Sequence, residues 1–182
     1  MGWQDEGDDV QFSEPILAKK DCQVRIDAAE QTEWKVREVV KGGAPGYEGQ
    51  AFKAMKLTCT ITDASVQTEH EGGKPRLTIE HQCNIDRYPY LDKKTGTVKW
   101  LGRQSLYDLE EAFGFEPVFT TADGQPVDPF ITRTGRKVAP KIEGVKRHLN
   151  PDFLSAYFTP DGTPNLEWAG KTVHADIDVE RS

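Results

Sequence analysis

The sequence predicts a mostly β fold with minor α content: a small five-stranded barrel with one or two short helices and a long irregular insertion. Apolar and polar residues alternate with a period of two in several separate runs, which is typical of half-buried strands. The sequence shows no repeated βαβ unit, so a parallel sheet is not expected. Closure into a barrel would leave no strand edge exposed, and 182 residues suit a single domain.

The predicted strands follow from this alternation. Three clear runs span about 21–36, 55–61 and 77–85, and a fourth spans 173–179 near the end of the chain. A shorter run around 98–100 supplies the fifth strand. An OB-fold is a five-stranded barrel with a helix, and the predicted elements match it in number. We therefore expect an OB-like barrel.

The predicted helices lie in the second half of the chain. Apolar residues recur every three or four positions across 102–113, and Gly114 follows where a helix C-cap would stand. A second, short helix is expected to begin at Asn150. Between the two helices, residues 115–148 are rich in proline and glycine and have no clean period, so we expect an irregular excursion there.

The first fifteen residues differ in composition from the rest. They carry five carboxylates, and we expect them to form a flexible acidic arm that precedes a single domain over 16–182. No stretch approaches the roughly 18 consecutive apolar residues of a membrane helix, and the acidic start is unlike a signal peptide. We therefore expect a cytoplasmic protein that makes no membrane contact.

The chemistry-bearing side chains give no catalytic or metal-binding motif. Cys22, Cys59 and Cys83 are odd in number, widely spaced and in apolar strand phases, so we expect reduced, buried thiols. No GxSxG sequence is present, and the four histidines are scattered. His81 has the phase of a core residue, so we expect its ring to be buried and hydrogen-bonded.

The carboxylates likewise predict ordinary surface positions. Asp176, Asp178 and Glu180 share one face of the last strand, which we read as a solvated face in preference to a cation site. Glu110 and Glu111 are expected on the helix surface. We therefore expect a binding protein without enzyme activity, cofactor or metal.

Basic residues gather in two clusters, although the chain has a net charge of -7. In the first cluster, cations and aromatic rings interleave: Arg87, Tyr88, Tyr90, Lys93, Lys94, Lys99, Trp100 and Arg103. The second lies in the irregular excursion, with one acid, Glu143, among six cations: Arg133, Arg136, Lys137, Lys141, Lys146 and Arg147.

The first cluster suits a single-stranded nucleic acid, which offers phosphates to cations and unstacked bases to flat rings. Tyr88 and Tyr90 fall in the polar phase of their strand, which favours exposure, whereas Trp34 and Trp100 are expected to be buried. Charged loops and buried aromatics are also common without any ligand, so a structural role stands beside this interpretation.

The chain from about Leu17 to Glu180 resembles a family of phage-encoded, OB-fold-like single-stranded-DNA-binding proteins from replication and recombination gene clusters. The resemblance lies in four segments: VRIDAAE at 24–30, LTCTITD at 57–63, LYDLEEAFG at 106–114 and AGKTVHADI at 169–177. It implies a non-catalytic protein that coats single strands in the host cytoplasm, with strongly salt-dependent affinity and weak sequence preference. Replication or recombination proteins are the implied protein partners.

The leading hypothesis assigns backbone contacts to Arg133, Arg136, Lys137 and Lys141 and base stacking to Tyr88 and Tyr90. Two alternatives remain open. The domain could be a phage structural or accessory protein whose 115–148 segment mediates assembly. It could also be an inhibitor whose acidic surface mimics nucleic acid, given the net charge of -7.

Overall fold

The computed structural model describes residues 16–178, so the predicted acidic arm at 1–15 lies outside the described residues. Within that range the fold is mostly β, with two short α-helices, α1 (Gln104–Ala112) and α2 (Pro151–Tyr157), and two 3₁₀ helices, η1 (Val39–Lys41) and η2 (Leu166–Trp168). The strands are β1 (Lys19–Lys35), β2 (Ala51–Ile61), β3 (Thr78–Asn84), β4 (Tyr88–Leu91), β5 (Val98–Leu101), β6 (Val118–Thr120), β7 (Pro126–Val127), β8 (Phe130–Ile131), β9 (Lys137–Val138), β10 (Lys146–His148) and β11 (Thr172–Ile177).

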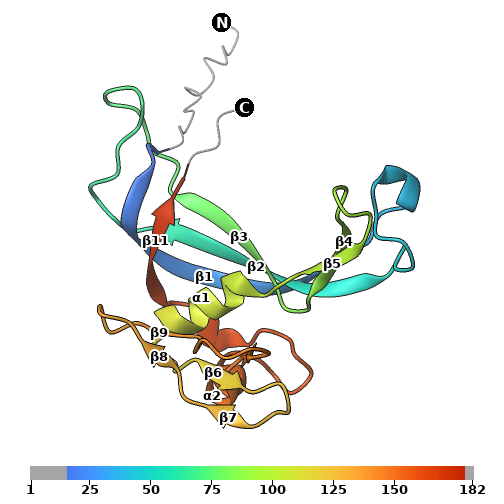
Figure 1. Cartoon of the computed structure of the whole chain (residues 1–182). Coiled ribbons are helices and arrows are strands. Elements are labelled where there is room, and N and C mark those ends of the chain that lie inside the picture. The colour runs from blue at the N-terminus through green and yellow to red at the C-terminus, as the bar shows by residue number, and fades with distance from the viewer. Residues whose placement is uncertain (1–15, 179–182) are drawn as a thin grey trace, which may run out of the picture.

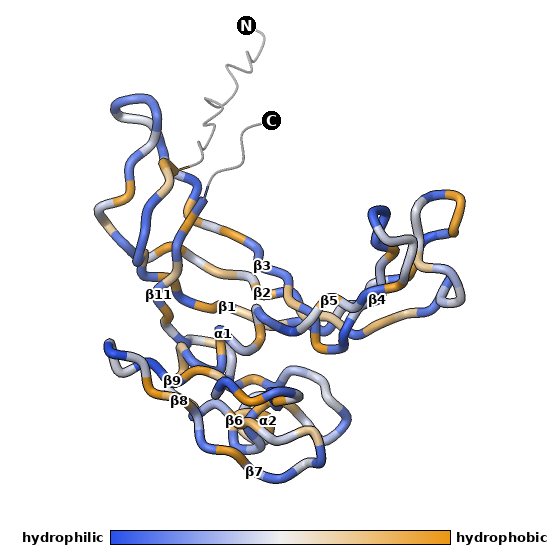
Figure 2. The backbone as a smooth tube through the Cα atoms, in the orientation of Figure 1, coloured by the Kyte–Doolittle hydropathy of each residue, from blue (hydrophilic) through white to orange (hydrophobic). Residues whose placement is uncertain are grey.

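The main sheet is antiparallel, with the strand order β11, β1, β2, β3 (Figure 1). Val24 is opposite both Val173 and Ile61, so the apolar phases of the three strands meet on one face. Figure 2 shows the apolar positions recurring between hydrophilic ones along these strands. The period-two alternation therefore predicted the four strands of this sheet correctly.

The predicted five-stranded barrel is wrong in its closure. None of the sheets in the described chain closes on itself, and β3 and β11 each pair with one neighbour only. The run around 98–100, expected as the fifth strand, pairs with β4 in a separate two-stranded hairpin. Because Pro89 in β4 has no amide hydrogen, that strand is also poorly suited to pairing on both sides.

The core lies between the sheet and the two helices. Leu106 of α1, Phe153 of α2 and Trp168 of η2 are each 0% exposed and join the inward residues of β1 and β2 in one cluster. The indole Nε1–H of Trp168 donates to the carbonyl oxygen of Tyr157 at 2.8 Å. Phe113 stacks on Tyr157 with the ring centroids 4.8 Å apart, so the bottom of the core is largely aromatic.

The segment 115–148, predicted to be irregular, contains five short strands. β6 and β7 are joined by a turn at 121–125, and β8 and β9 by a turn at 132–136. In each, the glycine amide donates to the threonine carbonyl, and the next amide donates to the threonine Oγ1 at 3.1 Å. Strands of two or three residues are too short to show a period, but the repeated Thr-x-x-Gly turn is the signal that predicts them.

All three cysteines are free and buried, as predicted. Burial raises the pKa of Cys59 to about 11 and that of Cys83 to about 12. Both are therefore neutral thiols near pH 7 and behave as small apolar side chains. No helix in the described part of the chain is long and apolar enough to cross a membrane.

Replacing Trp168 tests this account of the core. Trp168→Ala should lower the free energy of unfolding by about 3 to 5 kcal/mol, because it removes a large buried ring and one of the two donors to the Tyr157 carbonyl, the other being the Asn165 backbone amide. Leu166→Ala is the matched control in the same 3₁₀ helix, since Leu166 is 91% exposed. Chemical denaturation measures both, and equal losses would contradict the placement of the core.

Candidate nucleic-acid interface

One end of the β1 and β2 ribbon carries a projecting unit that we call the lobe, made of residues 34–53 and 86–101. Figure 1 shows it as the end of β1, the loop with η1, the start of β2 and the β4–β5 hairpin. The loop needs glycine: at Gly43 a Cβ would lie 1.8 Å from the carbonyl oxygen of Arg37. The Gly and Pro residues of 42–49 thus fold the loop tightly back onto the ribbon.

Aromatic rings hold the lobe together. Phe52 of β2 lies 5.8 Å from Tyr88 of β4 and 6.0 Å from Trp100 of β5, measured between ring centroids. Tyr47, from the loop before β2, packs edge-on against Trp100 at 5.2 Å. The Tyr88 hydroxyl also donates to the carbonyl of Lys35 at 3.5 Å. Segments distant in the sequence therefore meet at one aromatic cluster.

Several aromatic rings of the lobe, inside and outside this cluster, remain accessible to a ligand. Trp34 is 41% exposed and Trp100 is 44% exposed, so the prediction that both are buried is wrong. Tyr90 is 37% exposed, as its strand phase predicted, whereas Tyr88 is half-buried. The tryptophans were misassigned because the lobe is too thin to bury both faces of a two-stranded ribbon.

The charge of the lobe opposes that of the whole chain. It contains eight cations and four carboxylates, whereas the chain has a net charge of -7. The cations are Lys35, Arg37, Lys41, Lys53, Arg87, Lys93, Lys94 and Lys99. Sequence reasoning missed Trp34, Tyr47 and Phe52, and the first four of these cations, because they join the hairpin only through the tertiary fold.

Some lobe cations already have partners. Lys99 lies 2.5 Å from Asp92, whose hydrogen bond raises the pKa of Lys99, and the same contact lowers the pKa of Asp92. Lys53 donates to the carbonyl of Asp161 at 3.1 Å. Within residues 16–178, Arg87, Lys93 and Lys94 form no ion pair and are exposed. In the same described range, Lys35 and Arg37 are likewise exposed without an ion pair, so these five are the lobe cations most available to a phosphate.

The second predicted cluster is not brought to the lobe. Arg136 binds Glu111 of α1 through two guanidinium contacts, at 3.1 and 3.3 Å, and Lys137 pairs with Glu116. In the described chain, Arg133 and Lys141 are exposed without an ion pair. In the described chain, three of the six cations of 131–147, with Arg147 as the third, are thus paired with acids outside the segment, whereas Arg133, Lys141 and Lys146 are not.

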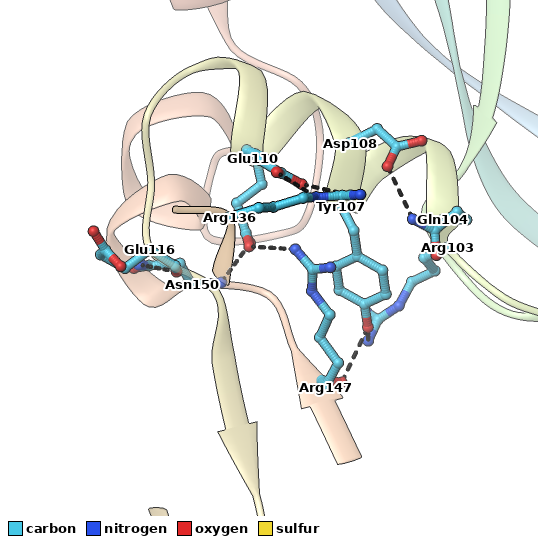
Figure 3. A network of polar contacts seen from close by, with 10 residues as sticks. Arg103, Gln104, Tyr107, Asp108, Glu110, Glu116, Arg136, Arg147 and Asn150 are labelled. Carbon is cyan, nitrogen blue, oxygen red and sulfur yellow. Dashed lines mark hydrogen bonds and ion pairs between the residues drawn. The ribbon is translucent and has the colours of Figure 1, made fainter. Parts of the chain in front are cut away.

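Figure 3 shows what holds α1 to this part of the chain. Glu110 is 0% exposed, so its predicted surface position is wrong. Its carboxylate accepts from the Asn150 backbone amide at 2.7 Å and from the Arg147 guanidinium at 3.5 Å. The Arg147 guanidinium lies 4.5 Å from the Tyr107 ring centroid, a cation–π contact.

Arg103 belongs to the same network and not to the lobe. Its guanidinium donates to the Tyr107 hydroxyl at 3.1 Å, and that hydroxyl donates to the carbonyl of Arg147 at 3.1 Å. Of the predicted nucleic-acid contacts, the structure therefore gathers Arg87, Tyr88, Tyr90 and the three lysines of the hairpin. It places Arg103, Arg133, Arg136, Lys137 and Lys141 elsewhere.

Other titratable residues give no metal centre in the described part of the chain, where no group of three or more His, Cys, Asp or Glu could hold an ion. Asp176 is exposed and accepts from the backbone amide of Asp21 at 2.9 Å, and Glu180 lies outside the described residues. His81 is exposed, so its predicted burial is wrong: β3 is an edge strand, and its inward face is left partly open.

No family model, curated protein or solved structure matches the chain.

Glu110 predicts a pH dependence of stability. Burial raises its pKa above the ordinary 4.5, so between these two values the folded protein binds more protons than the unfolded chain. Glu110 should thus add to the free energy of unfolding as the pH falls from about 7 toward the ordinary value. Urea denaturation at several pH values measures the unfolding free energy of the unmodified protein minus that of Glu110→Gln. This difference should become more positive as the pH falls. A difference that shrinks on acidification would contradict the burial of Glu110.

Proposed function

We propose that the protein is a non-catalytic single-stranded-DNA-binding protein and that the lobe is its interface. The observation that carries the proposal is the combination of exposed Trp34, Tyr90 and Trp100 with the unpaired cations Arg87, Lys93 and Lys94 on one projecting unit. Stacking requires a flat, accessible ring, and phosphate contacts require a cation that is not already neutralised. The lobe supplies both, in a chain whose overall charge repels DNA.

The geometry favours a single strand over a duplex. The bases of a duplex are stacked on one another, so an exposed indole has no base face to contact. The aromatic cluster around Phe52 holds the ring of Trp100 in place, which lowers the entropy lost when a base stacks on it. Phosphates of the same strand can then reach the lysines at the hairpin turn.

We further propose that the chain belongs with the phage-encoded, OB-fold-like binding proteins of replication and recombination. The support is the sequence resemblance together with a curved antiparallel sheet that is covered on one side by a helix. Coating of single strands in the bacterial cytoplasm, and contact with replication or recombination proteins, follow from that proposal. Arg133 and Lys141 would act as secondary contacts at most.

Removing the exposed rings should weaken DNA binding. Tyr90→Ala with Trp100→Ala should reduce affinity for an oligo-dT of about 30 nucleotides by about tenfold to a hundredfold for each stacked base lost. Fluorescence anisotropy measures this, and circular dichroism checks folding. Phe130→Ala is the matched control, because Phe130 is 57% exposed but lies outside the lobe. Absence of DNA binding together with a discrete oligomer by light scattering would instead favour the assembly function.

The cations can be tested separately through salt dependence. Lys93→Ala with Lys94→Ala should flatten the slope of log affinity against log salt by about 1.4, because each phosphate contact on a single strand contributes about 0.7. Arg136→Ala with Lys137→Ala is the control, because it removes the same number of charges from cations that are already paired with Glu111 and Glu116. Equal changes in the two variants would show that binding follows net charge and not the lobe.

A further inference from the structure

A second feature lies on the face of the main sheet that α1 covers, away from the lobe (Figure 1). A groove of about 520 Å³ runs between β3 and β11, with α1 along one side. Its floor is apolar and includes inward residues of all four strands: Val24, Ile26, Leu57, Cys59, Ile79, Val173, Ala175 and Ile177. The members on the two outer strands are only half-buried, so apolar surface remains open to solvent.

Two strand edges border this groove. In the described chain, β3 pairs only with β2, and β11 pairs only with β1. Each strand therefore has backbone N–H and C=O groups on its outer side without a strand partner, and such edges pair readily with another extended chain. Residues of both strands line the same groove, so the two edges approach it from opposite sides.

The groove lining is rich in carboxylates, and it also includes two histidines, His81 and His174. It includes the carboxylates of Glu80, Asp108, Asp176 and Asp178, and it includes no lysine or arginine. All four of these residues are exposed. An occupant that carried positive charge would therefore be attracted to the rim, whereas the floor favours apolar side chains.

We propose that this groove receives an extended segment of a partner protein in which apolar and basic residues alternate. Successive side chains of a strand point to opposite faces, so such a segment turns its apolar side chains to the floor and its cations toward the rim carboxylates. Its backbone pairs with the open edge of β3 or β11, and apolar burial and strand pairing act together, as in other cases of strand addition. The proposal is independent of DNA binding, because the groove and the lobe share no residue.

The probe is a labelled synthetic peptide in which valine and lysine alternate. Its length of about eight residues is within the usual range for a strand. It should bind the full chain, and hydrogen exchange of β3 or β11 amides should slow in its presence. The control peptide alternates valine and glutamate. Exchange protection elsewhere only, or equal binding of the two peptides, would overturn the proposal.

Charge-reversal variants give the matched test. Glu80→Lys with Asp178→Lys should weaken peptide binding at least about tenfold, because both rim carboxylates are reversed. Glu33→Lys with Glu143→Lys makes the same change in net charge at exposed residues outside the groove and should bind as the unmodified protein does. Equal weakening in both variants would mean that the peptide follows overall charge, which refutes the site.

Self-association is the remaining outcome to measure. Sedimentation measures the fraction of the protein that is dimeric. If, without peptide, the exchange protection of β3 and β11 rises with that fraction, a second copy of the chain fills the groove. That result would overturn the assignment to a partner protein. All four substituted residues are exposed, so the variants should fold. The exchange measurement uses the unmodified protein, so its result does not depend on the variants.

Discussion

The antiparallel pairing of β1 with β2 is the constraint on which the rest of the structure depends. β1 has 17 residues, and β2 pairs with it from Val24 to the end at Lys35. The first half of this ribbon is held by β3, β11 and the helices, whereas the second half extends past the core. The lobe projects because the backbone hydrogen bonds between β1 and β2 continue beyond the point where the main hydrophobic core ends. The exposure of Trp34 and Trp100 is a direct consequence of that mismatch.

The lower part of the molecule depends on a different interaction. Glu110 is buried with a charge partner, Arg147, and with a backbone donor, the Asn150 amide. A buried carboxylate without these partners would be strongly destabilising, so they constrain how α1 sits on β10 and on the start of α2. In the same arrangement, part of the positive charge of 131–147 stabilises the fold, because Arg147 pairs with Glu110.

Sequence patterns predicted what depends on neighbours in the chain. The four long strands, α1 with Gly114 after it, α2 with its Asn150 cap, and the buried thiols all follow from local periodicity or local capping. Closure of the sheet, burial of Glu110 and exposure of the two tryptophans depend on which segments meet in space. Tyr47 and Phe52 could not be linked to Tyr88 and Trp100 from spacing alone, because some forty residues of chain separate them along the sequence. The repeated threonine and glycine turns were a usable local signal for the hairpins of 115–148.

The small aromatic cluster that fixes the lobe has a consequence for how ligand binding would register in bulk measurements. Tyr47, Phe52, Tyr88 and Trp100 are not part of the main buried cluster, so their packing is a separate, weaker unit of cooperativity. On heating, such a unit opens before the core does, and a ligand that requires it is released at that earlier step. The main melting transition, which reports the core, is then nearly blind to occupancy, even where binding at ambient temperature is tight.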